Sequence, residues 1–250
     1  MTLPVLRVEW KPCWRIVPSR FPPVQLFERV TDPDDLEPVF ELDALTNPRL
    51  RDEAGDIELM PPEDRIHGPG TTVIMAAFTH LNPSGSRFSD GTCGVFCAAD
   101  DLDTAIAETK HHREQFLSAT AQAHMELDMR VYHVDLDGHL HDLRGQRAAQ
   151  PLVCHNDNYA ASQHLARTLR AAGSNGIVYD SVRRIEGECV AVFRPPLLSN
   201  ARQERHLCYV WNGQEVETVY EKREIGDDSQ FRSRCKAAAD THPEIVRLDR

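Results

Sequence analysis

Three short stretches of the sequence place an ionisable or hydroxyl side chain at the end of an apolar segment. Arg87 precedes the apolar run GVFCAA, and Glu108 follows that run on a predicted helix. Ser181 and Arg183 come directly after a second apolar run, GIVYD. Guanidinium groups match phosphate oxygens bidentately, and a carboxylate stabilises positive charge that develops on a sugar. These residue types together predict a site for an anionic ligand that contains a sugar.

Each of these residues, taken alone, has an ordinary structural explanation. An arginine at a strand edge usually extends its charged end to water, and a helical glutamate usually faces solvent. Their shared position at the ends of buried segments favours a binding site, because such sites form where loops leave a rigid scaffold. Arg15 lies in the hydrophobic start WRI, and Arg20 in PSRFPP is an alternative to it.

Other chemistries lack their sequence signatures. The chain has no GxGxxG after a strand and no GxxxxGK[ST], HExxH or GxSxG. His111 and His112 are adjacent on a predicted helix and point in different directions, so they are poor joint ligands. Cys93 and Cys97 have no second pair or nearby histidine. The sequence therefore predicts no metal site.

The whole chain has the composition of a soluble globular protein, with 41% hydrophobic and 27% charged residues over 250 positions. The formal net charge of -11 argues against direct nucleic-acid binding. No membrane-spanning run or signal peptide is present, and the scattered cysteines suit reduced thiols, so we expect a cytoplasmic protein. Residues 31–64 hold twelve acidic residues, which indicates a solvated surface or, as the sharper alternative, a dock for a basic protein.

The apolar pattern predicts strands and helices in mixed order. We expect helices at about 36–45, 71–82, 101–120 and 156–173, the third capped by Asp101 or Asp103 and the fourth by Asn156 or Asp157. We expect strands at GVFCAA, MRVYHVDLDG with a terminal Asp-Gly turn, GIVYD and ECVAVFRP, and a hairpin at CYVWNGQEVETV. The first seventy residues otherwise look irregular and proline-rich. This order favours an α+β fold, with a mixed, mostly antiparallel sheet and flanking helices.

At the residues named first, the sequence resembles the RES-domain family, named for an arginine, a glutamate and a serine. SRFSDGTCGVFCAADDLDTAIAET is similar to that family's G-R-W/F stretch, strand and A-x-x-E helix, and it supplies Arg87 and Glu108. SNGIVYDSVR is similar to the G-I-x-Y-x-S-x-R segment and supplies Ser181 and Arg183. WRI resembles the opening arginine segment, so the resemblance covers about residues 12–198.

The resemblance implies a fold similar to that of ADP-ribosyltransferases and an enzyme that acts on NAD⁺, with no metal. We expect cleavage of the nicotinamide–ribose bond, with ADP-ribose passed to water or phosphate. Two alternatives are ADP-ribosyl transfer to a protein acceptor and a catalytically impaired NAD-binding or interaction module. The resemblance also implies a toxin paired with a helix-turn-helix antitoxin, and it leaves a homodimer open.

The expected catalytic residues are Glu108, Arg87 and Ser181. Glu108 would hold a ribose hydroxyl and stabilise the oxocarbenium-like state, while Ser181 would supply a neutral hydrogen bond to ribose or phosphate. Arg15 and Arg87 would clamp the pyrophosphate, with Arg183 as a weaker third.

The remaining expected NAD-binding residues are Arg20, Phe96 and Cys97. Cys97 is also where the sequence departs from the family, because many relatives carry a tyrosine eleven residues before the glutamate. We expect a single catalytic domain over residues 1–220, with an acidic irregular insertion at about 31–70 and a polar extension at 221–250.

Overall fold

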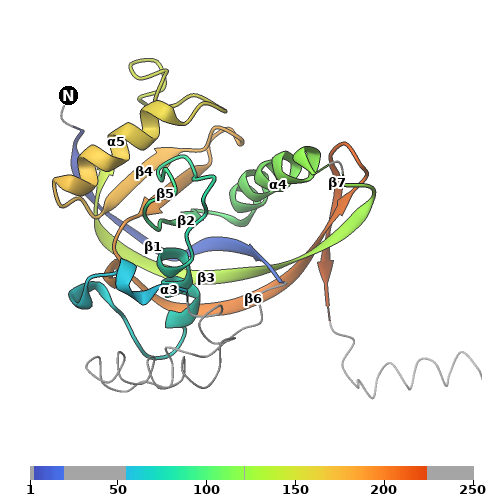
Figure 1. Cartoon of the computed structure of the whole chain (residues 1–250), viewed down its shortest axis with the longest axis horizontal. Coiled ribbons are helices and arrows are strands. Elements are labelled where there is room, and N and C mark those ends of the chain that lie inside the picture. The colour runs from blue at the N-terminus through green and yellow to red at the C-terminus, as the bar shows by residue number, and fades with distance from the viewer. Residues whose placement is uncertain (1–2, 20–54, 121, 224–250) are drawn as a thin grey trace, which may run out of the picture.

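A computed structural model describes residues 3–19, 55–120 and 122–223 of the chain (Figure 1). Within these ranges, seven strands form one sheet in the order β1-β2-β5-β4-β3-β6-β7. The strands are β1 (Val5–Pro18), β2 (Phe96–Ala99), β3 (Met125–Asp142), β4 (Gly176–Asp180), β5 (Glu188–Val192), β6 (Leu198–Trp211) and β7 (Val216–Lys222). The helices are α3 (Thr71–Thr79), α4 (Leu102–Ala119) and α5 (Ala160–Ala171), with short 3₁₀ turns η2 (Ile57–Leu59), η3 (Pro62–Asp64) and η4 (Pro195–Leu197).

The pairing of the strands is mostly antiparallel, since only β3 and β4 run parallel in the described sheet. β1 pairs with β2 and also with β3, so the strands β1-β2-β5-β4-β3 return on themselves. The long strand β3 also pairs with β6, and β6 with β7, so these strands extend the sheet into a curved arm (Figure 1). The α+β prediction with a mixed, mostly antiparallel sheet is therefore confirmed.

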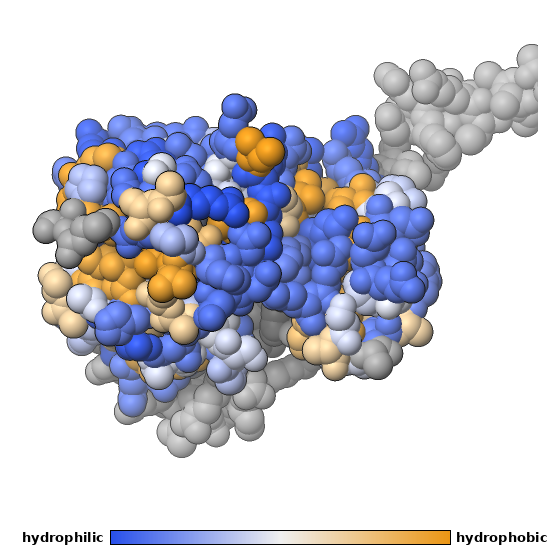
Figure 2. Space-filling model, turned by 90° about the horizontal axis from the view of Figure 1, so that it is seen from above, coloured by the Kyte–Doolittle hydropathy of each residue, from blue (hydrophilic) through white to orange (hydrophobic). Residues whose placement is uncertain are grey.

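The two faces of the sheet have separate cores. One face packs on α3 through Ile74, Met75 and Phe78, and the opposite face packs on α4 and α5 through residues that include Ala105 and Ala166. Figure 1 shows α4 and α5 together on one side of the sheet and α3 on the other. The α4–α5 face is mostly hydrophilic at the surface, with apolar residues gathered toward the side where α5 lies (Figure 2).

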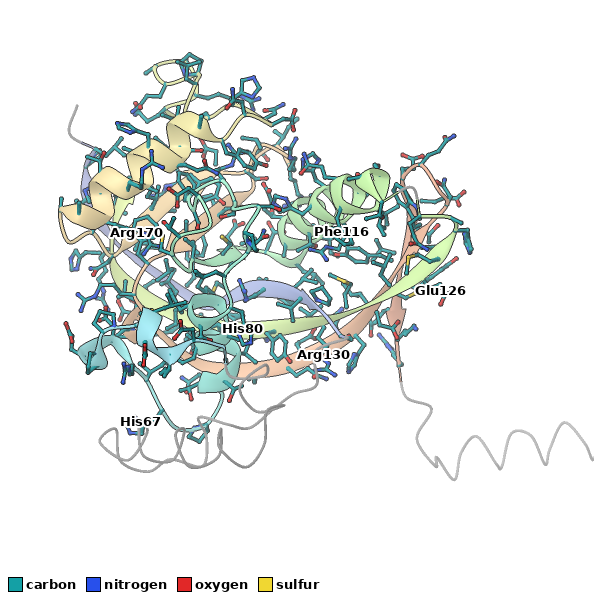
Figure 3. All side chains as sticks on the ribbon, viewed as in Figure 1. His67, His80, Phe116, Glu126, Arg130 and Arg170 are labelled. Carbon is teal, nitrogen blue, oxygen red and sulfur yellow. The ribbon has the colours of Figure 1, made fainter. Side chains whose placement is uncertain are left out.

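Helix α5 is attached to the sheet by a half-buried arginine near its end. The Arg170 guanidinium lies 4.0 Å over the ring of Phe193, and its Nη2 donates to the carbonyl of Gly94 at 2.6 Å (Figure 3). Burial lowers the pKa of Arg170. This contact joins α5 to the segment that leads into β2, and so to the part of the chain that carries Arg87.

Two expectations about the strands are wrong. The first seventy residues are not all irregular, because β1 occupies Val5–Pro18. Proline is unfavourable inside a strand, so Pro12 argues against one in the sequence; in the structure it lies where the β1–β3 register shifts, between Trp10 and Cys13. The predicted Asp-Gly turn at 137–138 does not form either, since β3 continues to Asp142. Gly138 is there for packing: a Cβ would lie 2.2 Å from Leu197 Cδ2.

Most of the other predicted elements are confirmed. α3, α4 with its Asp101 cap, β2, β4, β5 and the β6–β7 hairpin all form, although β6 begins ten residues earlier than CYVW. The cap proposed for α5 is wrong, since Tyr159 is its N-cap. The helix predicted at 36–45 lies outside the described residues. No helix in the described ranges has the length and apolar character needed to cross a membrane.

Candidate active site

Helix α4 presents Glu108 toward the sheet. The helix begins where Asp101 Oδ1 accepts from the Thr104 backbone N–H at 2.8 Å. Thr104 and Ala105, one turn before Glu108, are buried against the sheet, and positions three and four apart share a helix face. Glu108 is half-buried on that face.

Ser181 holds the Glu108 carboxylate from the end of β4. Its Oγ donates to Glu108 Oε1 at 2.6 Å, and it accepts the backbone N–H groups of Arg183 and Arg184, each at 3.1 Å. A serine hydroxyl has one proton and two lone pairs, so these three bonds use its whole capacity. The only hydroxyl proton therefore points at Glu108, and Ser181 is a positioning residue for that carboxylate.

The turn between β4 and β5 keeps Ser181 in place. Its backbone N–H donates to the Gly187 carbonyl at 2.8 Å, and Gly187 lies so close to α4 that a Cβ would be 2.4 Å from Thr104 Oγ1. Arg184 also reaches α4, where its Nη1 donates to Asp101 Oδ2 at 2.6 Å. The turn that carries Ser181 and the helix that carries Glu108 are thus fastened together.

Arg87 is buried, with only 7% of its surface exposed. Its Nη1 donates to the carbonyl of His155 at 2.7 Å and its Nη2 to that of Asn156 at 3.2 Å, while the guanidinium lies 4.6 Å over the ring of Tyr159. Arg183 Nη2 donates to the same Asn156 carbonyl at 2.6 Å and to Asp157 at 2.9 Å. Asn156 and Asp157 were expected as helix caps; they bind arginines instead.

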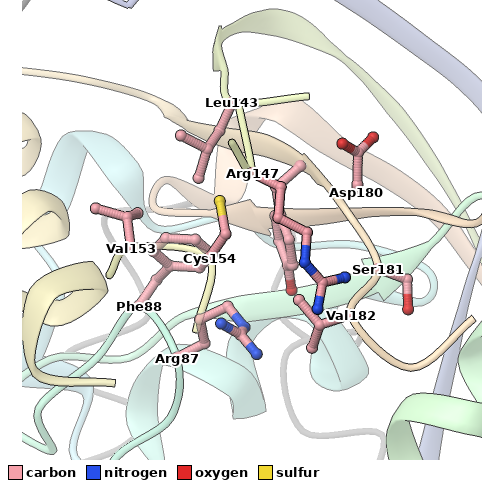
Figure 4. A pocket seen from close by; sticks show the side chains of 10 residues that line it. Arg87, Phe88, Leu143, Arg147, Val153, Cys154, Asp180, Ser181 and Val182 are labelled. Atoms are coloured by element: carbon pink, nitrogen blue, oxygen red, sulfur yellow. The ribbon is translucent and has the colours of Figure 1, made fainter. Parts of the chain in front are cut away.

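A hollow of about 320 Å³, measured to its open mouth, lies against Arg87 and Ser181 (Figure 4). Its wall is completed by apolar and polar side chains that are not among the expected site residues: Phe88, Leu143, Arg147, Val153, Cys154, Tyr179, Asp180 and Val182. Of the expected catalytic residues, Arg87 and Ser181 line this hollow, and Glu108 is joined to it through its bond to Ser181.

Arg15 lies elsewhere. Its guanidinium is 4.5 Å over the ring of Phe96, and its Nη1 donates to the Cys97 carbonyl at 2.8 Å. Phe96 belongs to the core on the α3 face, so the structure does not bring Arg15 to the hollow on the α4–α5 face. Burial lowers the pKa of Arg15. Arg20 lies outside the described residues.

Phe96 and Cys97 face opposite sides of the sheet, because successive strand residues alternate. Phe96 is fully buried toward α3, and Cys97 is on the face of Glu108. Burial raises the pKa of Cys97; the charge of Glu108 also raises it, and the charge of Arg87 lowers it. Of these two predicted NAD-binding residues, only Cys97 is on the side of the site.

Three groups beneath the site are kept uncharged by burial. Burial raises the pKa values of Tyr179 and Cys189 well above their ordinary range, and the nearby Glu108 carboxylate acts in the same direction. Burial, together with the charges of His111 and Arg183, lowers the pKa of His112 to about 4. His112 lies one turn after Glu108 on α4, so its neutral ring is on the same side of the helix.

Comparisons with known proteins agree with these motifs. The RES domain family model matches residues 62–212, which is more than half of the chain. An uncharacterised protein, y4oC of Sinorhizobium fredii (strain NBRC 101917 / NGR234), is 32% identical over 217 residues, covering 86% of this chain and 89% of its own. The chain belongs to the RES domain family.

A solved structure is also similar to the chain, at a lower level. It is the crystal structure of the M. tuberculosis MbcT-MbcA toxin-antitoxin complex, with a TM-score of 0.41 and 12% sequence identity. The match covers 79% of this chain and 86% of that one.

Proposed function

We propose that this protein degrades NAD⁺ by cleaving the bond between nicotinamide and ribose, and that it passes ADP-ribose to water or phosphate. The observation that carries the proposal is the 2.6 Å hydrogen bond from Ser181 to Glu108 beside a hollow that also contains Arg87. A carboxylate and a guanidinium are the two kinds of group needed to stabilise a sugar cation and to bind a phosphate anion.

In the proposed reaction, the bond from the ribose C1′ to the nicotinamide nitrogen breaks, and its electron pair leaves with nicotinamide. The ribose then carries positive charge, as in glycoside cleavage. Ser181 occupies Oε1 of Glu108, which leaves Oε2 to accept from a ribose hydroxyl and to stabilise the cation. Water or phosphate adds at C1′ and gives up its proton to solvent.

The test is incubation of the purified protein with NAD⁺ labelled in the adenine moiety, with and without inorganic phosphate. We expect free nicotinamide, and label in ADP-ribose or in its phosphorylated form. Label on protein would instead identify transfer to a protein acceptor. Calorimetric binding of NAD⁺ without nicotinamide release would identify a binding module and refute the enzymatic proposal.

A protein antitoxin of the helix-turn-helix type is part of the same proposal, and it is supported by membership of the RES domain family. NAD⁺ depletion arrests growth, so a toxin of this kind needs a partner that blocks it. The test is expression of the wild-type chain and of Glu108→Gln in a bacterial host. We expect growth arrest and loss of cellular NAD⁺ only with the wild-type chain, relieved by coexpression of the adjacent gene.

A further inference from the structure

Arg147 is an arginine of the hollow that no sequence motif covers. It lies in the segment of turns after β3, where Gln146 N–H donates to Leu143 O at 3.3 Å and Gln150 N–H to Gln146 O at 2.7 Å. Figure 4 shows its guanidinium reaching into the hollow on the side of Arg87 and Ser181, with Leu143 and Asp180 toward the other end.

A single asparagine gathers the arginines on this side. The Asn156 carbonyl accepts from Arg87 and Arg183, and its side-chain Oδ1 accepts from Arg147 Nη2 at 2.9 Å. Arg87 comes from the segment before β2, Arg147 from the turns after β3, and Arg183 from the turn after β4. Three guanidinium groups from separate parts of the chain thus converge around one residue.

Two of these guanidinium groups form no ion pair with a carboxylate of the described residues. Arg183 forms an ion pair with Asp157 at 2.9 Å. Within the described ranges, by contrast, neither Arg87 nor Arg147 forms an ion pair with a carboxylate. Asp180 also lines the hollow, and its Oδ2 accepts from the Gly145 backbone N–H at 2.7 Å. With two arginines and one carboxylate, the lining of the hollow has a net positive charge, which favours an anionic ligand.

We infer that Arg147 and Arg87 hold the diphosphate of the dinucleotide, and that Arg147 takes the role that the sequence suggested for Arg15. The inference rests on the proposed function and adds its phosphate subsite. The Asn156 bond orients Arg147 and leaves its other N–H groups free to bind a phosphate group bidentately. Arg87, whose two Nη atoms already donate to carbonyls, adds a second positive charge beside it. The ribose next to the diphosphate then faces the Ser181–Glu108 pair.

The experiment measures binding of ADP by calorimetry to the wild-type chain, Arg147→Gln and Arg7→Gln. Arg7 is an exposed arginine on β1 that pairs with Asp137, so it serves as the matched control. Losing hydrogen bonds to a charged group should raise the Kd for ADP about 10- to 100-fold in Arg147→Gln. Binding of adenosine, which lacks phosphate, should be the same in all three proteins.

Further measurements distinguish the diphosphate of the dinucleotide from free inorganic phosphate, and failure of this inference from failure of the proposed function. Asn156→Ala should weaken ADP binding in the same way, with little added loss in the double variant, since Asn156 acts through Arg147. The KM for NAD⁺ should rise in Arg147→Gln with little change in kcat. The inference is overturned if ADP binds Arg147→Gln as it binds the wild-type chain. It is also overturned if the variant loses only its activity with inorganic phosphate as co-substrate. Absence of nicotinamide release by the wild-type chain overturns the proposed function, and Arg147-dependent ADP binding would survive it.

Discussion

Replacing Glu108 by glutamine tests the charge at the centre of the site while preserving its shape. In the wild-type chain, Ser181 Oγ lies 2.6 Å from Glu108 Oε1. Glutamine retains a side-chain oxygen that can still accept this hydrogen bond. The substitution therefore removes the negative charge and leaves the β4–β5 turn attached to α4. If the carboxylate stabilises a ribose cation, only the transition state loses by this change.

The size of the effect follows from the kind of contact that is lost. Removing one preorganised electrostatic contact to a transition state costs about 3 to 4 kcal/mol, which corresponds to roughly a hundredfold to a thousandfold lower kcat. The KM for NAD⁺ should change much less, because the ground-state ribose is uncharged. Nicotinamide release measured over a range of NAD⁺ concentrations gives both constants.

Glu217→Gln provides the control, since it removes the same charge from an exposed position on β7, outside the turn that carries Ser181. It should retain the wild-type kcat, and thermal unfolding should show that both variants are folded. Near-normal turnover by Glu108→Gln would refute the role of the carboxylate. An equal loss in Glu217→Gln would show that the effect is one of overall charge.

Three further changes test how the site is built. Ser181→Ala removes a hydrogen bond to a charged acceptor, so kcat should fall about 10- to 100-fold with the fold intact; an unchanged rate would show that Glu108 needs no such support. His112→Gln removes a group whose pKa is about 4 in the folded chain and 6.5 in the unfolded chain. As the pH falls from 6.5 to 4, the unfolded state binds this proton and the folded state does not. The free energy of unfolding of the wild-type chain, measured with urea, should therefore fall by about 1 to 3 kcal/mol more than that of the variant. Parallel curves of the free energy of unfolding against pH for the two proteins would contradict this. Gly94→Ala would place a Cβ 2.3 Å from Phe78 Cα, so it should lower the free energy of unfolding by about 2 to 3 kcal/mol in the same assay. A urea midpoint equal to that of the wild-type chain would contradict this.

The parts of the site that the sequence predicts are those attached to regular elements. Arg87, Glu108 and Ser181 each stand next to an apolar run or on a well-capped helix, so their positions relative to strand and helix ends could be inferred. Their convergence on one hollow needs the sheet order β2-β5-β4, which brings the end of β4 beside α4. Local patterns hold no information about that order.

The residues that the sequence misplaces or omits fail for two physical reasons. Arg15 and Phe96 lie on strands, where alternation decides the face, and the apolar run FCAA does not show which side of a doubly covered sheet each residue faces. Arg147 and Asn156 lie in turns without periodicity, where position depends on backbone hydrogen bonds to distant segments.

The cysteine at position 97 bears on ligand binding more than on the carboxylate. Ser181 orients Glu108 from β4, and no hydrogen bond joins the Cys97 thiol to Glu108 in the described part of the chain. The support of the carboxylate is thus independent of the side chain at 97. A tyrosine there would add an aromatic surface on the face of the sheet that carries the site, while leaving the Ser181–Glu108 pair intact.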